Sequence, residues 1–186
     1  HRWLVMALLN NAFSGQSDTA LNDTRKAVGE HAQEMDFPAD AINAELRRSG
    51  RKTSFDEETV DAILGFTYGK SLTFLALSLL YDDNNWGNTN YHQDHIFPQA
   101  LFTSKHLNSI DLSPDRQKRY LELANRIGNL ELLSSPENLE KSSKDFRMWL
   151  ATRNSDFKKR HLIPDDDSLL LFNKFEEFII AREELI

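Results

Sequence analysis

The chain has 186 residues, of which 40% are hydrophobic and 27% are charged, an ordinary composition for a soluble globular protein. It contains no cysteine, which excludes both a disulfide scaffold and a cysteine-ligated zinc site. The net charge of −7 argues against a generally basic nucleic-acid binder, although the basic segment from Lys141 to Arg160 is able to hold a phosphate backbone locally.

The chain begins with His1 rather than an initiator methionine, and no signal-peptide pattern follows it. We therefore interpret the sequence as an internal piece of a longer protein, with a sensor domain expected before it. The longest apolar stretch, Ser71–Tyr81, is too short to span a bilayer. We expect a cytoplasmic protein that does not contact a membrane.

Helical patterns fill the first 81 residues. Apolar spacing and cap residues predict helices over Trp3–Phe13, Ser17–Met35, Pro38–Arg48 and Ser71–Tyr81, with a further helix beginning near Phe55. This part carries no catalytic motif. We predict that residues 1–81 form a helical extension packed on a core made by residues 82–186.

Short strands and helices alternate after residue 90. Tyr91–Phe97 and Leu130–Leu133 favour strands, and Pro98 ends the first of them. Helices are predicted over Gln99–Leu107, Ser113–Arg126, Ser135–Trp149 and Ser168–Leu185. The fold class is therefore α+β and mainly helical.

The first polar group of interest lies at the end of the predicted strand. Asp94 and His95 place a carboxylate beside an imidazole, directly before Ile96-Phe97-Pro98. A neutral histidine accepts a proton from water near pH 7, and a carboxylate suits Mg²⁺. Taken alone, such a pair is more often an ordinary surface or capping pair.

The second polar group surrounds the second predicted strand. Asn129 precedes the strand and Asn138 lies in the first turn of the next helix, with Lys141 and Lys144 following on the same helical face. An amide oxygen is a neutral ligand for a hard cation. Asparagine is also common in turns and caps, so each residue alone is weak evidence for a site.

Together the two groups resemble the HNH, or His-Me finger, nuclease superfamily. The chain is particularly similar to the C-terminal nuclease domain of GmrSD-type modification-dependent restriction proteins, through Asp94–Gln99, Ile127–Leu130, Asn138 and Lys141. A similar Asp-His-Ile-x-Pro-Gln run occurs in the HNH domain of RNA-guided nucleases. The resemblance covers about residues 91–145 and implies a small ββα-metal core flanked by helices.

The resemblance also implies roles for single residues. His95 matches the general base, while Asp94 and Asn138 match the ligands of one Mg²⁺ or Mn²⁺ ion. Asn129 matches the middle asparagine, which holds the loop between the strands. These four residues are the predicted catalytic residues. Lys141, Lys144 and Arg147 are predicted to contact nucleic acid, and His92 is an additional candidate that we cannot place as a ligand.

The function implied is a metal-dependent DNA endonuclease that nicks or cleaves, the effector domain of a prokaryotic restriction or anti-phage defence protein. Its partners would be DNA, the preceding sensor domain and, in a double-strand cutter, a second copy of the chain. An inactive HNH-fold domain that binds nucleic acid or protein is the main alternative. A helical interaction module with chance matches, and a nuclease acting on RNA, are further alternatives.

One geometric requirement tests this hypothesis. Adjacent residues of a regular strand point to opposite faces of the sheet. Asp94 and His95 are able to serve one site only if the strand ends or bends there.

Overall fold

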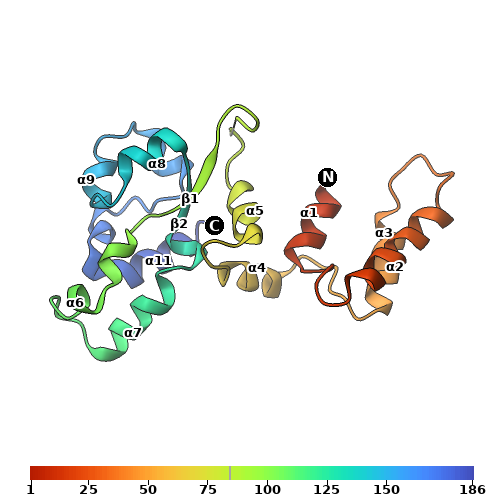
Figure 1. The fold of residues 1–186 in the computed structure, drawn as a ribbon, viewed down its shortest axis with the longest axis horizontal. Coiled ribbons are helices and arrows are strands. Elements are labelled where there is room, and N and C mark those ends of the chain that lie inside the picture. Colours follow the sequence, from red (N-terminus) through yellow and green to blue (C-terminus); the bar gives the residue numbers. More distant parts are fainter. Residues whose placement is uncertain (84) are drawn as a thin grey trace. The chain divides into compact units, whose positions relative to one another are not determined.

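The computed structural model describes residues 1–83 and 85–186 and divides the chain into two compact units, His1–Ile63 and Leu64–Ile186. The predicted fold class is confirmed, because the described elements are mainly helices, together with one small antiparallel sheet (Figure 1). The predicted boundary between residues 81 and 82 falls inside the second unit, and it stays a prediction about domains.

The N-terminal unit is helical. It contains α1 (Arg2–Leu9), α2 (Ser17–Glu30), α3 (Ala39–Arg48) and all but the last residue of α4 (Glu57–Leu64). Helices α2 and α3 pack on each other through four fully buried side chains, Ala20, Ala27, Ile42 and Leu46. Small residues on α2 let the two helices approach closely, so this unit has its own small core.

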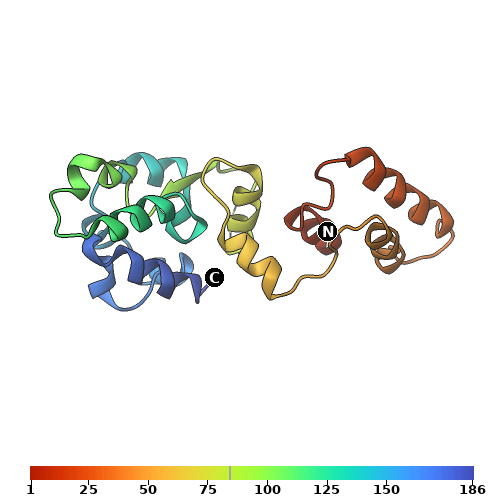
Figure 2. The same cartoon turned by 90° about the horizontal axis from the view of Figure 1, so that it is seen from below.

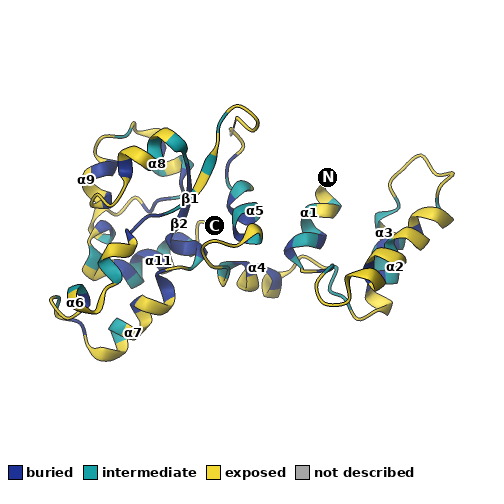
Figure 3. Cartoon of the chain, viewed as in Figure 1, coloured by how far each residue is buried: buried dark blue, intermediate teal, exposed yellow. Residues whose placement is uncertain are grey.

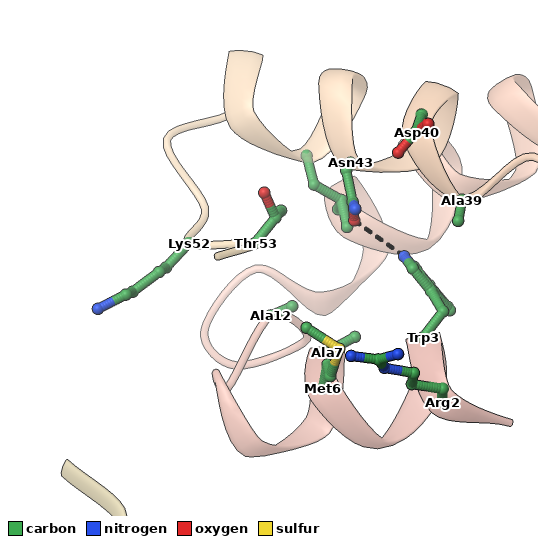
Figure 4. A pocket seen from close by; sticks show the side chains of 11 residues that line it. Arg2, Trp3, Met6, Ala7, Ala12, Ala39, Asp40, Asn43, Lys52 and Thr53 are labelled. Atoms are coloured by element: carbon green, nitrogen blue, oxygen red, sulfur yellow. Dashed lines mark hydrogen bonds between the residues drawn. The ribbon is translucent and has the colours of Figure 1, made fainter. Parts of the chain in front are cut away.

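A cavity of about 430 Å³ lies within this unit, lined largely by α1 and α3 (Figure 4). Trp3 forms one wall and donates its indole N–H to Asn43 Oδ1 at 2.9 Å. None of the predicted site residues lines the cavity.

The second unit is built on the pairing of β1 (Tyr91–His95) with β2 (Leu130–Ser134). The strands are antiparallel, with Asp94 opposite Glu131 and His95 opposite Leu130. Helix α5 (Ser71–Ser78) packs on β2, and α8 (Ser135–Lys141) packs against both strands (Figure 1). The order strand, strand, helix is thus present at the positions that the sequence predicts.

Other short helices complete this unit. They are η1 (Gln99–Phe102), α6 (Ser104–Leu107), α7 (Pro114–Leu123), η2 (Ile127–Asn129), α9 (Phe146–Leu150), α10 (Asp156–Arg160), η3 (Asp167–Leu170), η4 (Phe172–Lys174) and α11 (Phe175–Glu183). Helices α7 and α11 lie side by side (Figures 1 and 2). Strand β2 and the inner side of α11 are buried (Figure 3).

The core of this unit is rich in aromatic rings. Phe97 lies at its centre, and the rings of Phe172, Phe175 and Phe178 surround it with centroids 5.0–6.1 Å away. Aromatic pairs of this kind add packing energy beyond the area that they bury. The residue two positions after His95 is therefore firmly anchored.

Three predicted helices are interrupted in the structure. The helix predicted over Gln99–Leu107 is divided at Thr103, which is extended. The helix predicted through Trp149 stops at Lys141, because Ser142 has a φ of 47° and Asp145 caps a new helix by accepting from Met148 N. The helix predicted over Ser168–Leu185 is likewise broken, since Leu171 is extended. None of these breaks contains glycine or proline.

None of the helices within residues 1–83 and 85–186 combines the length and the apolar composition that crossing a bilayer requires.

Candidate active site

The candidate site lies where β1 ends. His95 is the last residue of this strand, and Ile96 and Phe97 continue as a bend. The strand therefore stops at the point that the hypothesis requires. The side chains of Asp94 and His95 nevertheless have separate partners, as expected for neighbours that leave a strand on opposite faces.

His95 is buried within a shell of polar and aromatic groups, with 6% of its surface exposed. Its Nε2 lies 2.9 Å from Asn125 Oδ1 and 3.4 Å from Gln99 Nε2, and the ring of Tyr68 packs against it at 4.5 Å between centroids. Burial lowers the pKa of His95, although Asn125 and Asp94 oppose the shift. The imidazole is therefore neutral at physiological pH, as a general base must be.

Asp94 points to α8 and pairs with the ammonium of Lys141. The same Lys141 Nζ donates to the backbone carbonyl of His95 and lies 5.5–5.6 Å from the rings of Phe146 and Trp149. Burial raises the pKa of Asp94, and the nearby Lys141 charge offsets this only in part. Lys141 thus ties the last two residues of β1 to α8.

The ammonium of Lys141 also belongs to a buried charge cluster. Glu131 Oε1 lies 3.3 Å from Lys141 Nζ, and Glu131 Oε2 lies 2.8 Å from His161 Nδ1, all within fully buried side chains. Burial alone would raise the pKa of Glu131, but Lys141, His161 and Arg182 together lower it to about 2. The carboxylate is therefore ionised near neutral pH and needs these partners.

Asn129 is fully buried and joins two loops. Its Oδ1 accepts from Phe97 N at 2.9 Å, and its Nδ2 donates to Phe97 O at 3.2 Å and to Ala124 O at 2.8 Å. The amide thus fixes the residues just after His95 to the turn just before Asn125. It forms no part of the surface that a substrate would touch.

Asn138 and His92 lie on the exposed side of the same ββα unit. Asn138 is half-buried, one helical turn before Lys141, and its side chain has no hydrogen bond to any residue that the structure describes. His92 is exposed, and its Nε2 lies 2.9 Å from Ser135 Oγ. The structure therefore places Asn138 on the helix that contacts Asp94, while it links His92 to the start of that helix.

Asp94 and Asn138 each offer an oxygen donor that suits a hard cation. Asp94 Oδ1 accepts no hydrogen bond within the described part of the chain, and the Asn138 amide is equally unengaged. Carboxylate and amide oxygens suit Mg²⁺, which keeps most of its water ligands in protein sites. Within residues 1–83 and 85–186, no three side chains of His, Cys, Asp or Glu gather around a common point. The donor set thus fits a magnesium ion held by few protein ligands.

The three predicted phosphate contacts differ in exposure. Lys141 is fully buried and its ammonium is engaged by Asp94, Glu131 and the His95 carbonyl, so the structure corrects its predicted role to a structural one. Lys144 and Arg147 are exposed, and neither forms an ion pair with a residue that the structure describes. These two cations remain available for a polyanion.

Two site residues lie outside the pattern that the sequence analysis used. Tyr68 packs on His95, although the first 81 residues show no catalytic motif. Residues 66–70 reach the site because Tyr68 N donates to Asn125 O at 2.8 Å, and Gln93 bonds Gly69 N at 2.9 Å and Lys70 O at 3.0 Å. Asn125 lies four residues before Asn129, but no local signal marks its contact with a residue 30 positions away.

Comparison with known proteins gives one family. The model of the GmrSD restriction endonuclease C-terminal domain matches residues 43–185, which is most of the chain. No curated protein matches the chain. The match includes every residue of the ββα unit described above.

Proposed function

Because the chain belongs to the family of GmrSD restriction endonuclease C-terminal domains, we propose that it is a metal-dependent DNA endonuclease of the HNH type. The observation that carries the proposal is the placement of His95, a neutral imidazole at the end of the first strand of a ββα unit, beside Asp94. The effector of a prokaryotic restriction or anti-phage defence system is the biological role that the family supports.

The chain's own residues perform the following steps in this proposal. His95 removes the proton from a water molecule that attacks the scissile phosphorus, because its neutral form has a free lone pair. Asn129 holds the backbone after His95, and Lys141 holds the backbone of His95 itself. The general base is thus positioned by contacts from both η2 and α8.

Asp94 and Asn138 are the proposed ligands of Mg²⁺ or Mn²⁺. When bound, such an ion neutralises charge on the phosphate and on the leaving oxygen. Asp94 contributes one carboxylate oxygen that Lys141 does not occupy, and Asn138 contributes its amide oxygen from the facing helix.

Metal dependence is tested with supercoiled plasmid. We expect the protein to relax or linearise the plasmid with Mg²⁺ or Mn²⁺, and to leave it intact when excess EDTA removes the ion. Matched RNA is expected to survive under the same conditions. Cleavage that persists in EDTA would contradict the metal-dependent mechanism. Faster cleavage of RNA than of DNA would show that RNA is the preferred substrate.

The alternative function is an inactive domain of the same fold that binds nucleic acid or a protein partner. It keeps the fold but predicts that neither Mg²⁺ nor Mn²⁺ binds at Asp94 and Asn138. Isothermal titration with Mn²⁺, comparing the wild type with Asp94→Ala, separates the two: heat in the wild type alone supports the nuclease.

The exposed cations predict how DNA binding responds to salt. Replacing Lys144 and Arg147 together by alanine is expected to weaken binding, because two phosphate contacts and the counterions that they release are lost. The slope of log K against log salt should become shallower by roughly 2. The measurement is fluorescence anisotropy of a labelled duplex, made in a His95→Ala background so that the DNA stays intact.

Lys118→Ala is the matched control for that experiment. Lys118 is an exposed lysine on α7, which Figure 1 draws at the opposite end of this unit from α8. We expect its salt slope to equal that of the parent protein. If the Lys144/Arg147 variant has the same salt slope as the parent protein, these two residues are not phosphate contacts.

A further inference from the structure

The contact between His95 and Asn125 determines which ring nitrogen of His95 carries hydrogen. A neutral imidazole has one N–H and one lone pair, and the partner of one nitrogen sets the role of the other. Asn125 Oδ1 is an acceptor and lies 2.9 Å from His95 Nε2. The hydrogen therefore belongs on Nε2, and Nδ1 keeps the lone pair.

The neighbouring Gln99 supports this orientation of the Asn125 amide. Gln99 Nε2 lies 3.3 Å from Asn125 Oδ1 and donates to it. Its approach to His95 Nε2, at 3.4 Å, is a contact between two donors in this tautomer and not a hydrogen bond. With Oδ1 at this point, the oxygen accepts from both His95 and Gln99. If the amide were reversed, its NH₂ would face the NH₂ of Gln99, leaving two donors without an acceptor between them.

Asn125 is itself held in place from two sides. Its backbone carbonyl accepts from Tyr68 N at 2.8 Å, and the carbonyl just before it, Ala124 O, accepts from the buried Asn129 Nδ2 at 2.8 Å. The same Asn129 binds the backbone of Phe97, two residues after His95. One buried amide thus fixes the distance between the loop of His95 and the loop of Asn125.

The opposite ring nitrogen is left available. Within the described part of the chain, His95 Nδ1 has no hydrogen-bond partner, while Tyr68 covers one face of the ring at 4.5 Å. A ring held at Nε2 and packed on one face has a defined direction for its Nδ1 lone pair. A general base needs a lone pair with a defined direction as well as the correct protonation state.

We propose that Asn125 is a positioning residue, whose amide oxygen holds His95 in the tautomer with hydrogen on Nε2 and leaves Nδ1 to accept the proton from water. The proposal rests on the proposed function for its catalytic meaning, but the tautomer is a property of the free protein. Asn125 acts on the reaction only through His95.

The test reads the tautomer directly. Nitrogen-15 NMR of the whole chain, with labelled histidine and at a pH above the usual histidine range, distinguishes the two ring nitrogens of each of its six histidines. The signals of His95 are those missing from His95→Gln. We expect hydrogen on Nε2 in the wild type and in Asn125→Asp, which keeps an acceptor, and a mixture of tautomers in Asn125→Leu, which has none.

Kinetics then separate positioning from folding. For Asn125→Leu we expect kcat to fall by roughly 10- to 100-fold, the usual effect of removing such a partner, with KM unchanged. Asn108→Leu is the control, because Asn108 is exposed, follows α6 and is not among the residues that His95 contacts in the described part of the chain. Equal thermal unfolding of both variants shows that each is folded.

Three outcomes would overturn the proposal: hydrogen on Nδ1 in the wild type, an unchanged tautomer in Asn125→Leu, or a changed tautomer with unchanged kcat. None of these affects the proposed function, which fails separately if cleavage by the wild type does not depend on His95. In that case the NMR spectra alone decide whether Asn125 sets the tautomer.

Discussion

Replacing His95 by alanine is expected to lower the rate of DNA cleavage by roughly 10²- to 10⁴-fold, the range that a general base contributes. Alanine removes the imidazole at the end of β1, the group that accepts the proton from water in the proposed mechanism. The measurement is the rate of loss of supercoiled plasmid with Mg²⁺ at saturating protein concentration.

The controls for this prediction address contamination and folding. His31→Ala removes a histidine of the N-terminal unit that pairs with Glu34, and its cleavage rate should equal that of the wild type. Thermal unfolding of His95→Ala must remain cooperative, because His95 is buried. Equal cleavage by the wild type and His95→Ala would show that another residue, or another protein in the preparation, does the chemistry.

Much of the ββα unit follows from local signals. Proline at position 98 and the β-branched and aromatic residues before it predict β1, and the structure ends this strand at His95. Helix α8 begins where Pro136 and Glu137 predict a helix, with Glu137 Oε2 accepting from Ser134 N at 2.9 Å. Such signals act over three or four residues, and the sequence alone is sufficient to read them.

The break at Leu171 depends on packing that no local pattern reports. The residues from Leu169 to Ile179 have helical spacing, yet Leu171 is extended. The break brings Phe172 and Phe175 around the ring of Phe97, and the energy of this aromatic packing exceeds the small propensity for one continuous helix. Tertiary contacts thus decide the ends of these elements.

The surroundings of the site show the same limit. Asp94 and His95 are visible in the sequence as neighbours. Tyr68 and Asn125 contact His95 from distant positions, Asn125 from 30 residues away. The sequence predicts that Lys141 contacts nucleic acid, yet its side chain is buried. Its burial follows from Glu131, a carboxylate inside an apolar strand, which requires a cation from elsewhere in the fold.

Lys141→Met is expected to destabilise the second unit by about 3–5 kcal/mol, because it leaves the carboxylates of Glu131 and Asp94 without their cation. Methionine has nearly the same length and fills the space beside Phe146 and Trp149, so a cavity contributes little. Urea unfolding followed by tryptophan fluorescence measures the change, since Trp149 reports on this region.

Lys144→Met is the matched control, an exposed lysine three residues further along, and it should change stability by less than about 0.5 kcal/mol. The double variant Lys141→Met/Glu131→Gln should recover part of the loss, because removing both members of a buried pair costs less than removing one. One result would contradict this prediction: a Lys141→Met protein that is as stable as Lys144→Met and whose DNA binding depends less steeply on salt than that of the wild type. That result would show that Lys141 contacts phosphate. Recovery in the double variant would instead establish that this lysine serves the fold, holding the end of β1 against α8 so that Asp94 and His95 keep their places.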